Sequence, residues 1–173
     1  MSNYLRFRVP GGLYFFTVVT AGRQPLLIEH VDKLRLAFRP VRDRHPFRIE
    51  AAVILPDHLH CVWQLPDGDA DFSSRWRLIK SAFSRALRPA TNGYHRKDCG
   101  ERNIWQRRFW EHALRDETDV AAHVDYIHYN PVKHGHVLRP CDWGHSTFKQ
   151  FVENGVYEMT WGEAGIRSDL AVE

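Results

Sequence analysis

The sequence predicts an α+β fold in which an antiparallel sheet carries helices on one face and an added C-terminal helix follows. Three observations favour it. Segments with strand and helix periodicity alternate in the order β-α-β-β-α-β-α. A Pro-Asp turn separates two adjacent strand-like segments, as in a hairpin. The length of 173 residues suits one domain.

The first part of the chain contains three predicted strands and one predicted helix. Residues 13–20 (LYFFTVVT) are aromatic and β-branched, which is typical of a buried strand. Apolar residues recur at helical spacing over residues 29–44, although a proline lies in the last turn. Residues 47–55 (FRIEAAVIL) and 59–65 (LHCVWQL) form a predicted hairpin around the turn at Pro56-Asp57.

The second part continues with a helix, a strand and a last helix. The helix is predicted over residues 73–87, where four apolar side chains share one face. Residues 105–114 (WQRRFWEHAL) indicate a strand, broken or unbroken at its two arginines. The last helix spans residues 117–130 and is expected to end before Pro131, because a proline disfavours the α conformation in the residue before it. No structure is assigned after Val132.

The first six elements have the order of a ferredoxin-like unit, and the seventh is the added C-terminal helix. We expect the catalytic domain to span residues 1–150. Residues 151–173 are an acidic tail, either separate or part of the same domain.

Charge is distributed unevenly along the chain. The formal net charge is +3, but residues 75–115 hold eleven Lys/Arg against three acidic residues, and residues 150–173 hold one Arg against five. A basic middle favours a nucleic-acid partner, although a solvated basic helix gives the same count. No segment approaches the roughly 18–20 apolar residues of a membrane span. Three widely spaced cysteines favour free thiols, so we expect a cytoplasmic protein without a membrane partner.

His58 and His60 are the first candidates for chemistry. Residues i and i+2 of a strand point to the same face, so both imidazoles can reach one metal ion while Leu59 points to the core. Imidazole binds Zn, Mn and Ni readily. Two histidines at this spacing are also consistent with an exposed strand that binds nothing.

Tyr126 and Asn130 are the second pair. They lie four residues apart on the last predicted helix and therefore share a face. An Asn carbonyl can serve as a third metal ligand, and a Tyr one turn away can present its hydroxyl to a phosphate on that metal. Glu111 and His123 are supporting candidates. The alternative is that Tyr126 is an ordinary packing aromatic.

The runs PDHLHCVWQLP, WQRRFWEHALRDE and HVDYIHYNPVKHG resemble the REP-associated tyrosine transposases, of the single-tyrosine HUH transposase superfamily. The resemblance implies a ferredoxin-like catalytic domain that binds Mg or Mn. It assigns His58 and His60 to the HUH pair, Tyr126 to the nucleophile and Asn130 to the third ligand. Many members have Gln where this chain has Asn130. The implied tyrosine chemistry forms a 5′-phosphotyrosine link and leaves a free 3′-OH.

The resemblance also implies a substrate, namely single-stranded or hairpin DNA of the REP type with a 5′ guide sequence, which is cleaved and rejoined. Basic side chains contact phosphates without reading sequence. Trp105, Phe109 and Trp110 can stack on unpaired bases, although at least two of them are expected in the core. The expected DNA-contact residues are Arg6, Arg8, Arg75, Arg77, Lys80, Arg85, Arg88, Arg107, Arg108 and Lys133.

Two other functions fit part of these observations. A hairpin DNA- or RNA-binding protein without strand transfer would use the same fold but would need none of His58, His60, Tyr126 and Asn130. A zinc hydrolase would need a further carboxylate, and the sequence has no HExxH helix to support it. We expect a monomer, with a dimer as the alternative.

Overall fold

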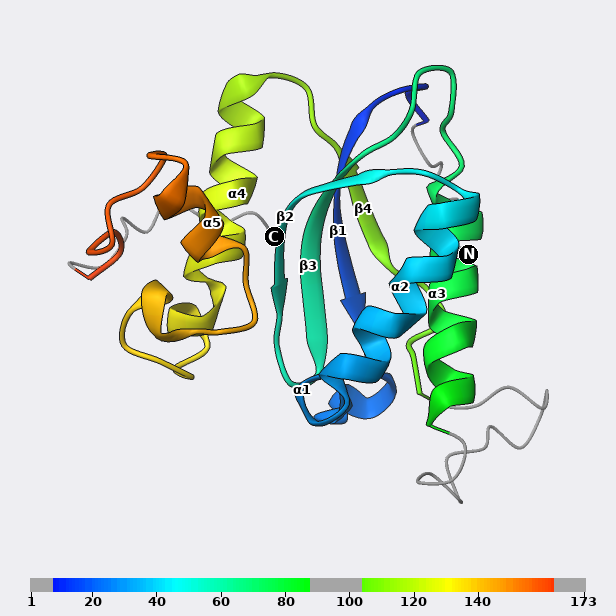
Figure 1. Ribbon diagram of the computed structural model, residues 1–173, viewed down its shortest axis with the longest axis horizontal. Coiled ribbons are helices and arrows are strands. Elements are labelled where there is room, and N and C mark those ends of the chain that lie inside the picture. Colours follow the sequence, from blue (N-terminus) through cyan, green and yellow to red (C-terminus); the bar gives the residue numbers. More distant parts are fainter. Residues whose placement is uncertain (1–7, 88–103, 164–173) are drawn as a thin grey trace, which may run out of the picture.

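The computed structural model describes residues 8–87 and 104–163. Its described part contains a four-stranded antiparallel sheet in the order β2-β3-β1-β4 (Figure 1). Strand β3 lies between β1 and β2, so the β1-helix-β2 unit is split by another strand. This split arrangement is ferredoxin-like, as predicted. The strands are β1 Leu13–Val19, β2 Arg48–Ile54, β3 His58–Gln64 and β4 Trp110–Ala113.

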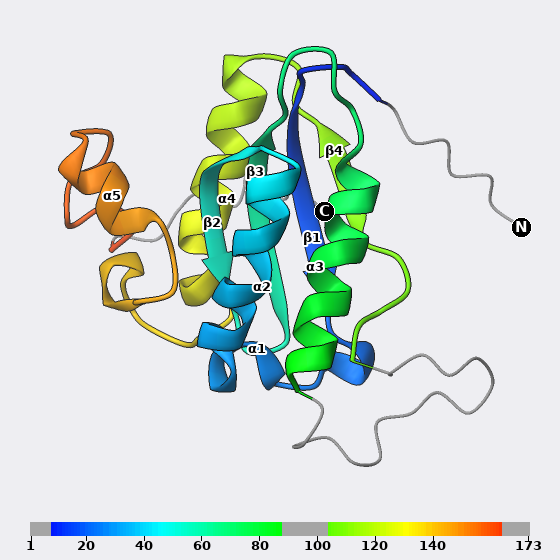
Figure 2. The ribbon, with the colours of Figure 1, turned by 45° about the vertical axis from the view of Figure 1, so that its right-hand side comes forward.

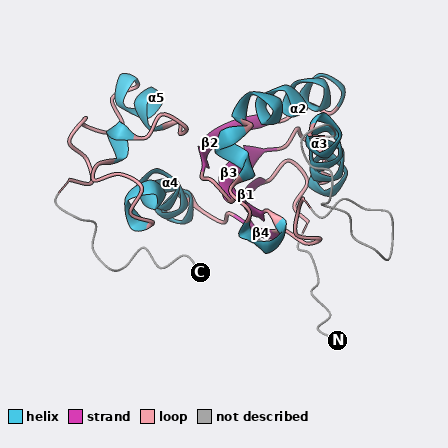
Figure 3. Ribbon diagram, turned by 90° about the horizontal axis from the view of Figure 1, so that it is seen from below, coloured by secondary structure: helices cyan, strands magenta, loops and turns pink. Residues whose placement is uncertain are grey.

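Helices cover both faces of the sheet. The two ferredoxin-like helices, α2 and α3, lie side by side on one face (Figure 2). The added helix α4 lies on the other face, and α5 lies beyond it (Figure 3). The helices are α1 Leu26–Glu29, α2 Val31–Arg44, α3 Phe72–Ala86, α4 Glu117–Lys133 and α5 Phe148–Glu153, with short 3-10 turns at Ala21–Arg23 and Pro140–Asp142.

The central strands bury side chains on both faces, which is why they contain almost no polar alternation. Phe16 and Trp63 belong to the core shared with α2 and α3, where the Trp63 and Trp76 rings stack 4.2 Å apart. Phe15 and Val62 belong to a second core shared with α4. Neighbouring residues of one strand therefore reach different cores, because side chains alternate across a strand.

One predicted boundary was wrong, the end of the last helix, and two that the sequence left open are settled. The strand expected over residues 105–114 is broken at its two arginines: Trp105 bridges to Thr20, and β4 begins only at Trp110. Helix α2 continues through Pro40, whose exposed position lets water reach the carbonyl that the missing N–H leaves unpaired. Helix α4 continues three residues beyond Asn130, because the buried Pro131 lies within its last turn and the His134 N–H still reaches the Asn130 carbonyl at 3.0 Å.

The segment after α4 folds back along the edge of β2. The Ile54 N–H donates to the His145 carbonyl at 2.8 Å, and the Thr147 N–H donates to the Ala52 carbonyl at 2.9 Å. This pairing covers part of an otherwise open strand edge. Residue 150, the expected domain boundary, falls inside α5. Over the described residues, no helix combines the length and apolar character needed to cross a membrane.

Arg75 corrects one expected DNA contact. Its side chain is buried, with 2% of the residue exposed. The guanidinium donates to Asp69 at 2.6 Å and to the carbonyls of His45 and Pro46 at 3.1 and 2.9 Å. The hydrogen bond from Arg75 holds the pKa of the Asp69 carboxyl below its usual range. Arg75 therefore ties α3 to the loops around it and is not available to a phosphate.

We predict that Arg75→Ala lowers the free energy of unfolding by about 2 kcal/mol. Removing one partner of a buried ion pair costs about 3–5 kcal/mol, and the partial exposure of Asp69 reduces this. The exposed Arg77 on the same helix is the matched control, and Arg77→Ala should change stability by less than about 0.5 kcal/mol. Urea unfolding measures both. Equal stability losses in the two variants would contradict the structural role of Arg75.

Candidate active site

His58 and His60 lie on the face of the sheet that α4 covers. They pair with Val19 and Thr17 of β1. Their ring centres are 5.0 Å apart, with the rings nearly perpendicular. His58 and His60 are 4% and 2% exposed, so neither is the exposed strand histidine that the alternative reading required.

A second residue orients each imidazole through Nδ1. The His58 Nδ1 lies 2.6 Å from Asp57 Oδ1, and the His60 Nδ1 lies 2.9 Å from Thr17 Oγ1. Each Nε2 is therefore left to face another ligand, which is how outer residues orient metal-binding histidines. Asp57 is itself held by the loop after β1, because its carbonyl accepts the Thr20 N–H at 2.8 Å.

Electrostatics keep His60 in the metal-binding form. Burial holds the pKa of His60 well below its usual value, and the nearby basic groups of His58, His134 and Lys133 act in the same direction. A neutral imidazole is the form that binds a metal ion. Burial alone would raise the pKa of Asp57, but hydrogen bonds from His58 and Arg23 bring it below its usual value, so the carboxylate stays charged.

Helix α4 brings Tyr126 and Asn130 to the histidines. Asp116 caps its start by accepting the Asp119 N–H at 2.9 Å, and Gly135 adopts φ +69° just after its end. The Tyr126 ring lies 5.2 Å from the His60 ring and meets it edge-on. Asn130, one turn further, is completely buried. The structure therefore brings Tyr126 to His60, and Asn130 lies on the same helix between Tyr126 and His134, whose ring is 5.0 Å from that of His58.

These groups fit a divalent metal ion. Two imidazoles on one ion have ring centres roughly 5 Å apart, because each metal–nitrogen bond is about 2 Å long. Within the described residues, the His60 Nε2 and both amide atoms of Asn130 are buried without a hydrogen-bond partner. Buried polar atoms are rarely left unpaired, and of these three the His60 Nε2 and the Asn130 Oδ1 are acceptors that a metal ion could bind.

Lys133 and His134, at the end of α4, complete the site. The Lys133 Nζ lies 3.4 Å from the Tyr126 hydroxyl oxygen and 4.6 Å from the centre of its ring. The His134 ring lies 5.0 Å from the His58 ring. The sequence analysis predicted that Lys133 contacts DNA and did not single out His134. Their helical spacing from Tyr126 and Asn130 was the available signal, but it depended on a helix continuing through Pro131.

His112, Asp119 and His123 form a separate group that could hold a metal ion. The His112 Nε2 and His123 Nδ1 lie 2.9 and 3.0 Å from the two Asp119 carboxylate oxygens. Their rings stack almost parallel, with centres 4.9 Å apart. Imidazoles that share an ion must each hold it in the ring plane, which stacked rings do not do. The group is better described as a hydrogen-bonded bridge between β4 and the first turn of α4.

The other expected residues lie in several places. Glu111 pairs with Phe16 and so faces the α2–α3 side, away from the histidines, which is a correction. His123 lies on the site face, with its ring 4.8 Å from that of Phe15. Tyr129 faces Trp161, 6.4 Å away, as expected from its position on the helix.

The expected basic contacts are scattered. Arg77, Lys80 and Arg85 belong to α3, on the opposite side of the sheet from the histidines. Arg107 and Arg108 are exposed before β4, and Arg8 lies 5.8 Å from the Phe72 ring. Arg6 and Arg88 lie outside the described residues.

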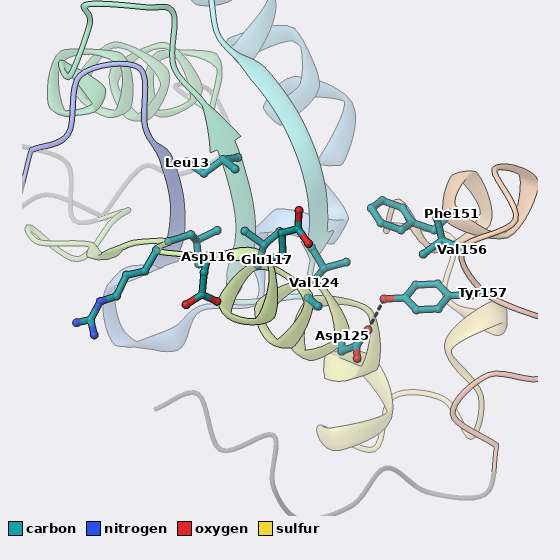
Figure 4. A pocket seen from close by; sticks show the side chains of 12 residues that line it. Leu13, Asp116, Glu117, Val124, Asp125, Phe151, Val156 and Tyr157 are labelled. Carbon is teal, nitrogen blue, oxygen red and sulfur yellow. Dashed lines mark hydrogen bonds between the residues drawn. The ribbon is translucent and has the colours of Figure 1, made fainter.

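An apolar pocket of about 450 Å³ lies beside the first turns of α4, between the start of β1 and the segment around α5 (Figure 4). Leu13, Val124 and Phe151 line it, and the Tyr157 hydroxyl donates to Asp125 at 2.6 Å beside it. None of the histidine, tyrosine and asparagine candidates lines this pocket, so it is separate from the site.

Comparisons with known proteins identify the family. The family model described as "Transposase IS200 like" matches residues 9–130, which include all four candidate residues. A REP-associated tyrosine transposase of Escherichia coli (strain K12) is 48% identical over 93% of this chain and 91% of its own. A protein of Haemophilus influenzae is 42% identical over 94% of both chains.

A solved structure shares the same fold. It is described as a REP-associated tyrosine transposase bound to a REP hairpin, and it matches with a TM-score of 0.81 and 48% identity. The match covers 93% of this chain and 91% of the other. The chain belongs to the IS200-like transposases and, within them, to the REP-associated tyrosine transposases.

Proposed function

We propose that this transposase cleaves and rejoins single-stranded DNA beside a REP-like hairpin, with Tyr126 as the nucleophile. His58, His60 and Asn130 would hold one Mg or Mn ion. The observation that carries the proposal is the convergence of two oriented imidazoles, a buried amide and a tyrosine from segments about 70 residues apart. A protein that only bound DNA would need none of these groups together.

The chain's own residues account for the steps. The Tyr126 hydroxyl oxygen attacks the phosphorus and the bond to the 3′ oxygen breaks, which leaves a 3′-OH on one strand and a 5′-phosphotyrosine on the protein. The tyrosine proton leaves with the 3′ oxygen or through water. When bound, the ion would polarise a phosphoryl oxygen and stabilise the charge that builds on it. The link keeps the phosphodiester energy, so a 3′-OH can reverse the step.

Lys133 would assist the attack. A tyrosine has an ordinary pKa near 10 and is a weak nucleophile at neutral pH. The ammonium beside the hydroxyl favours the phenolate that forms as the proton leaves. Tyr126 is 3% exposed, whereas Lys133 and His134 are exposed, so they mark the side from which a strand would reach the hydroxyl.

The proposed substrate follows from the relative, whose structure is described as bound to a REP hairpin. For this chain, Lys133, Arg107 and Arg108 are exposed cations that can contact phosphates. All proposed catalytic residues come from one chain, because α4 packs on its own sheet. This arrangement supports a monomer as the working unit.

Tyr126→Phe should abolish covalent capture of DNA. The wild-type protein, mixed with a REP hairpin oligonucleotide carrying unpaired flanks and Mn or Mg, should give an adduct that survives a denaturing gel. Tyr129→Phe is the matched control and should keep the adduct, since Tyr129 faces Trp161. An adduct that persists in Tyr126→Phe overturns the assignment. A hairpin shifted on a native gel, with no adduct under any metal, indicates the pure binder.

Chelation should stop adduct formation, and added Mn or Mg should restore it. Asn130→Ala should raise the metal concentration needed by about tenfold or more, because one proposed ligand is lost. Asn130→Asp keeps an oxygen at the same place and should need far less metal than Asn130→Ala. Titration of adduct yield against Mn measures both. An unchanged requirement in Asn130→Ala would remove Asn130 from the ligand set.

Lys133→Met should slow adduct formation up to about tenfold near neutral pH and move the rising limb of the pH–rate profile to higher pH. The direction follows because a positive charge lowers the pKa of a neighbouring phenol, and its removal raises that pKa. Lys133→Arg keeps the charge and should leave the profile near that of the wild type. A uniform loss at all pH values would instead indicate a DNA contact.

A further inference from the structure

Trp110 is the first residue of the edge strand β4, and it is 42% exposed. The other two aromatics expected to stack on bases are partly buried against the α2–α3 core. Trp110 and His60 both pair with Thr17, on opposite sides of β1. Paired residues point to the same face, so Trp110 shares the face of the histidines, two strand spacings or roughly 10 Å from His60.

The Trp110 ring ends a column of parallel rings. It stacks on His112, with ring centres 5.9 Å apart and planes 10° apart. His112 stacks in turn on His123, 4.9 Å away and at 15°. Asp119 bonds both imidazoles and so fixes the column to α4. One face of the indole is therefore supported, and Phe15 meets the ring edge-on.

The column runs from the row of the sheet that contains Val62 to the row that contains His60, so its Trp110 end is level with the proposed cleavage site. Strands β3 and β4 are both antiparallel to β1, so they run in the same direction. The step from His112 to Trp110 is therefore parallel to the step from Val62 to His60. A further flat ring on Trp110 would lie in the row of the sheet that contains His58.

We propose that Trp110 is the stacking platform for an unpaired DNA base one or two nucleotides from the cleaved phosphate. This inference rests on the proposed function. A flat, partly exposed aromatic ring with His112 stacked against it suits a nucleobase, and stacking of this kind accepts any base. Arg107 and Arg108 precede Trp110 and are exposed, so the strand that delivers the base would meet positive charge. A ligand without a flat ring could not stack on Trp110.

The test is a cycle of abasic substitutions, measured as binding without cleavage. Tyr126→Phe protein without metal is titrated with a fluorescent REP hairpin oligonucleotide. Each unpaired nucleotide beside the hairpin is made abasic in turn. At one position the abasic DNA should bind about 5- to 150-fold more weakly. Adding Trp110→Ala should weaken the binding of intact DNA by a similar factor. In that variant, the abasic substitution should then cause no further loss of affinity.

Three variants complete the design. Trp110→Tyr keeps a ring and should retain most of the abasic effect, whereas Trp110→Leu keeps apolar volume and should behave like Trp110→Ala. Leu36→Ala removes an exposed apolar side chain from α2 and should leave the DNA affinity and the abasic effect unchanged. Equal abasic effects with and without Trp110 at every position would overturn the inference. Because no cleavage is measured, that result leaves the adduct test of Tyr126 untouched, and a missing adduct leaves this cycle readable.

Discussion

The packing of α4 on the face of the sheet opposite α2 and α3 is the contact on which the site depends. Val124 and Ile127 of α4 bury against Val53 and Val62 of the sheet. The same packing turns Tyr126 toward His60 and places Asn130 in a fully buried position. In the proposed reaction neither pair would act alone, because the histidines would hold the metal ion and Tyr126 would attack the phosphate. The burial of apolar side chains between α4 and the sheet therefore brings the candidate residues of the site together.

That packing also encloses polar atoms at a cost. The His60 Nε2 and the Asn130 amide lie in the interior without protein partners in the described part of the chain, and an unpaired buried polar group costs about 1–3 kcal/mol. Thr17 and Asp57 bond the Nδ1 of each histidine ring, so the Nε2 side cannot turn away to find a partner. The segment after α4, paired to the edge of β2, holds the helix in place against this cost. A bound ion would satisfy the His60 Nε2 and the Asn130 Oδ1.

Most of the fold and the central part of the site could be predicted from the sequence. Strand alternation and helical spacing located the main elements, and the His58-Leu59-His60 and Tyr126–Asn130 spacings fixed which side chains share a face. Tertiary contacts decided the rest. Arg75 looked like any other arginine of a basic helix, but the loops beside α3 bury it. Glu111 faces α2 and α3 instead of the histidines because β4 pairs it with Phe16 of β1. Lys133 and His134 lie at the site because α4 continues through the buried Pro131.

The proposed metal site is tested most directly by pulsed EPR of bound Mn²⁺, which counts the imidazole nitrogens coupled to the ion. We expect two such nitrogens in the wild type, a loss in His58→Ala and in His60→Ala, and no change in His112→Ala, whose imidazole belongs to the hydrogen-bonded bridge. Coupling that survives in His58→Ala and His60→Ala but disappears in His112→Ala would place the metal at the bridge and contradict the proposed site.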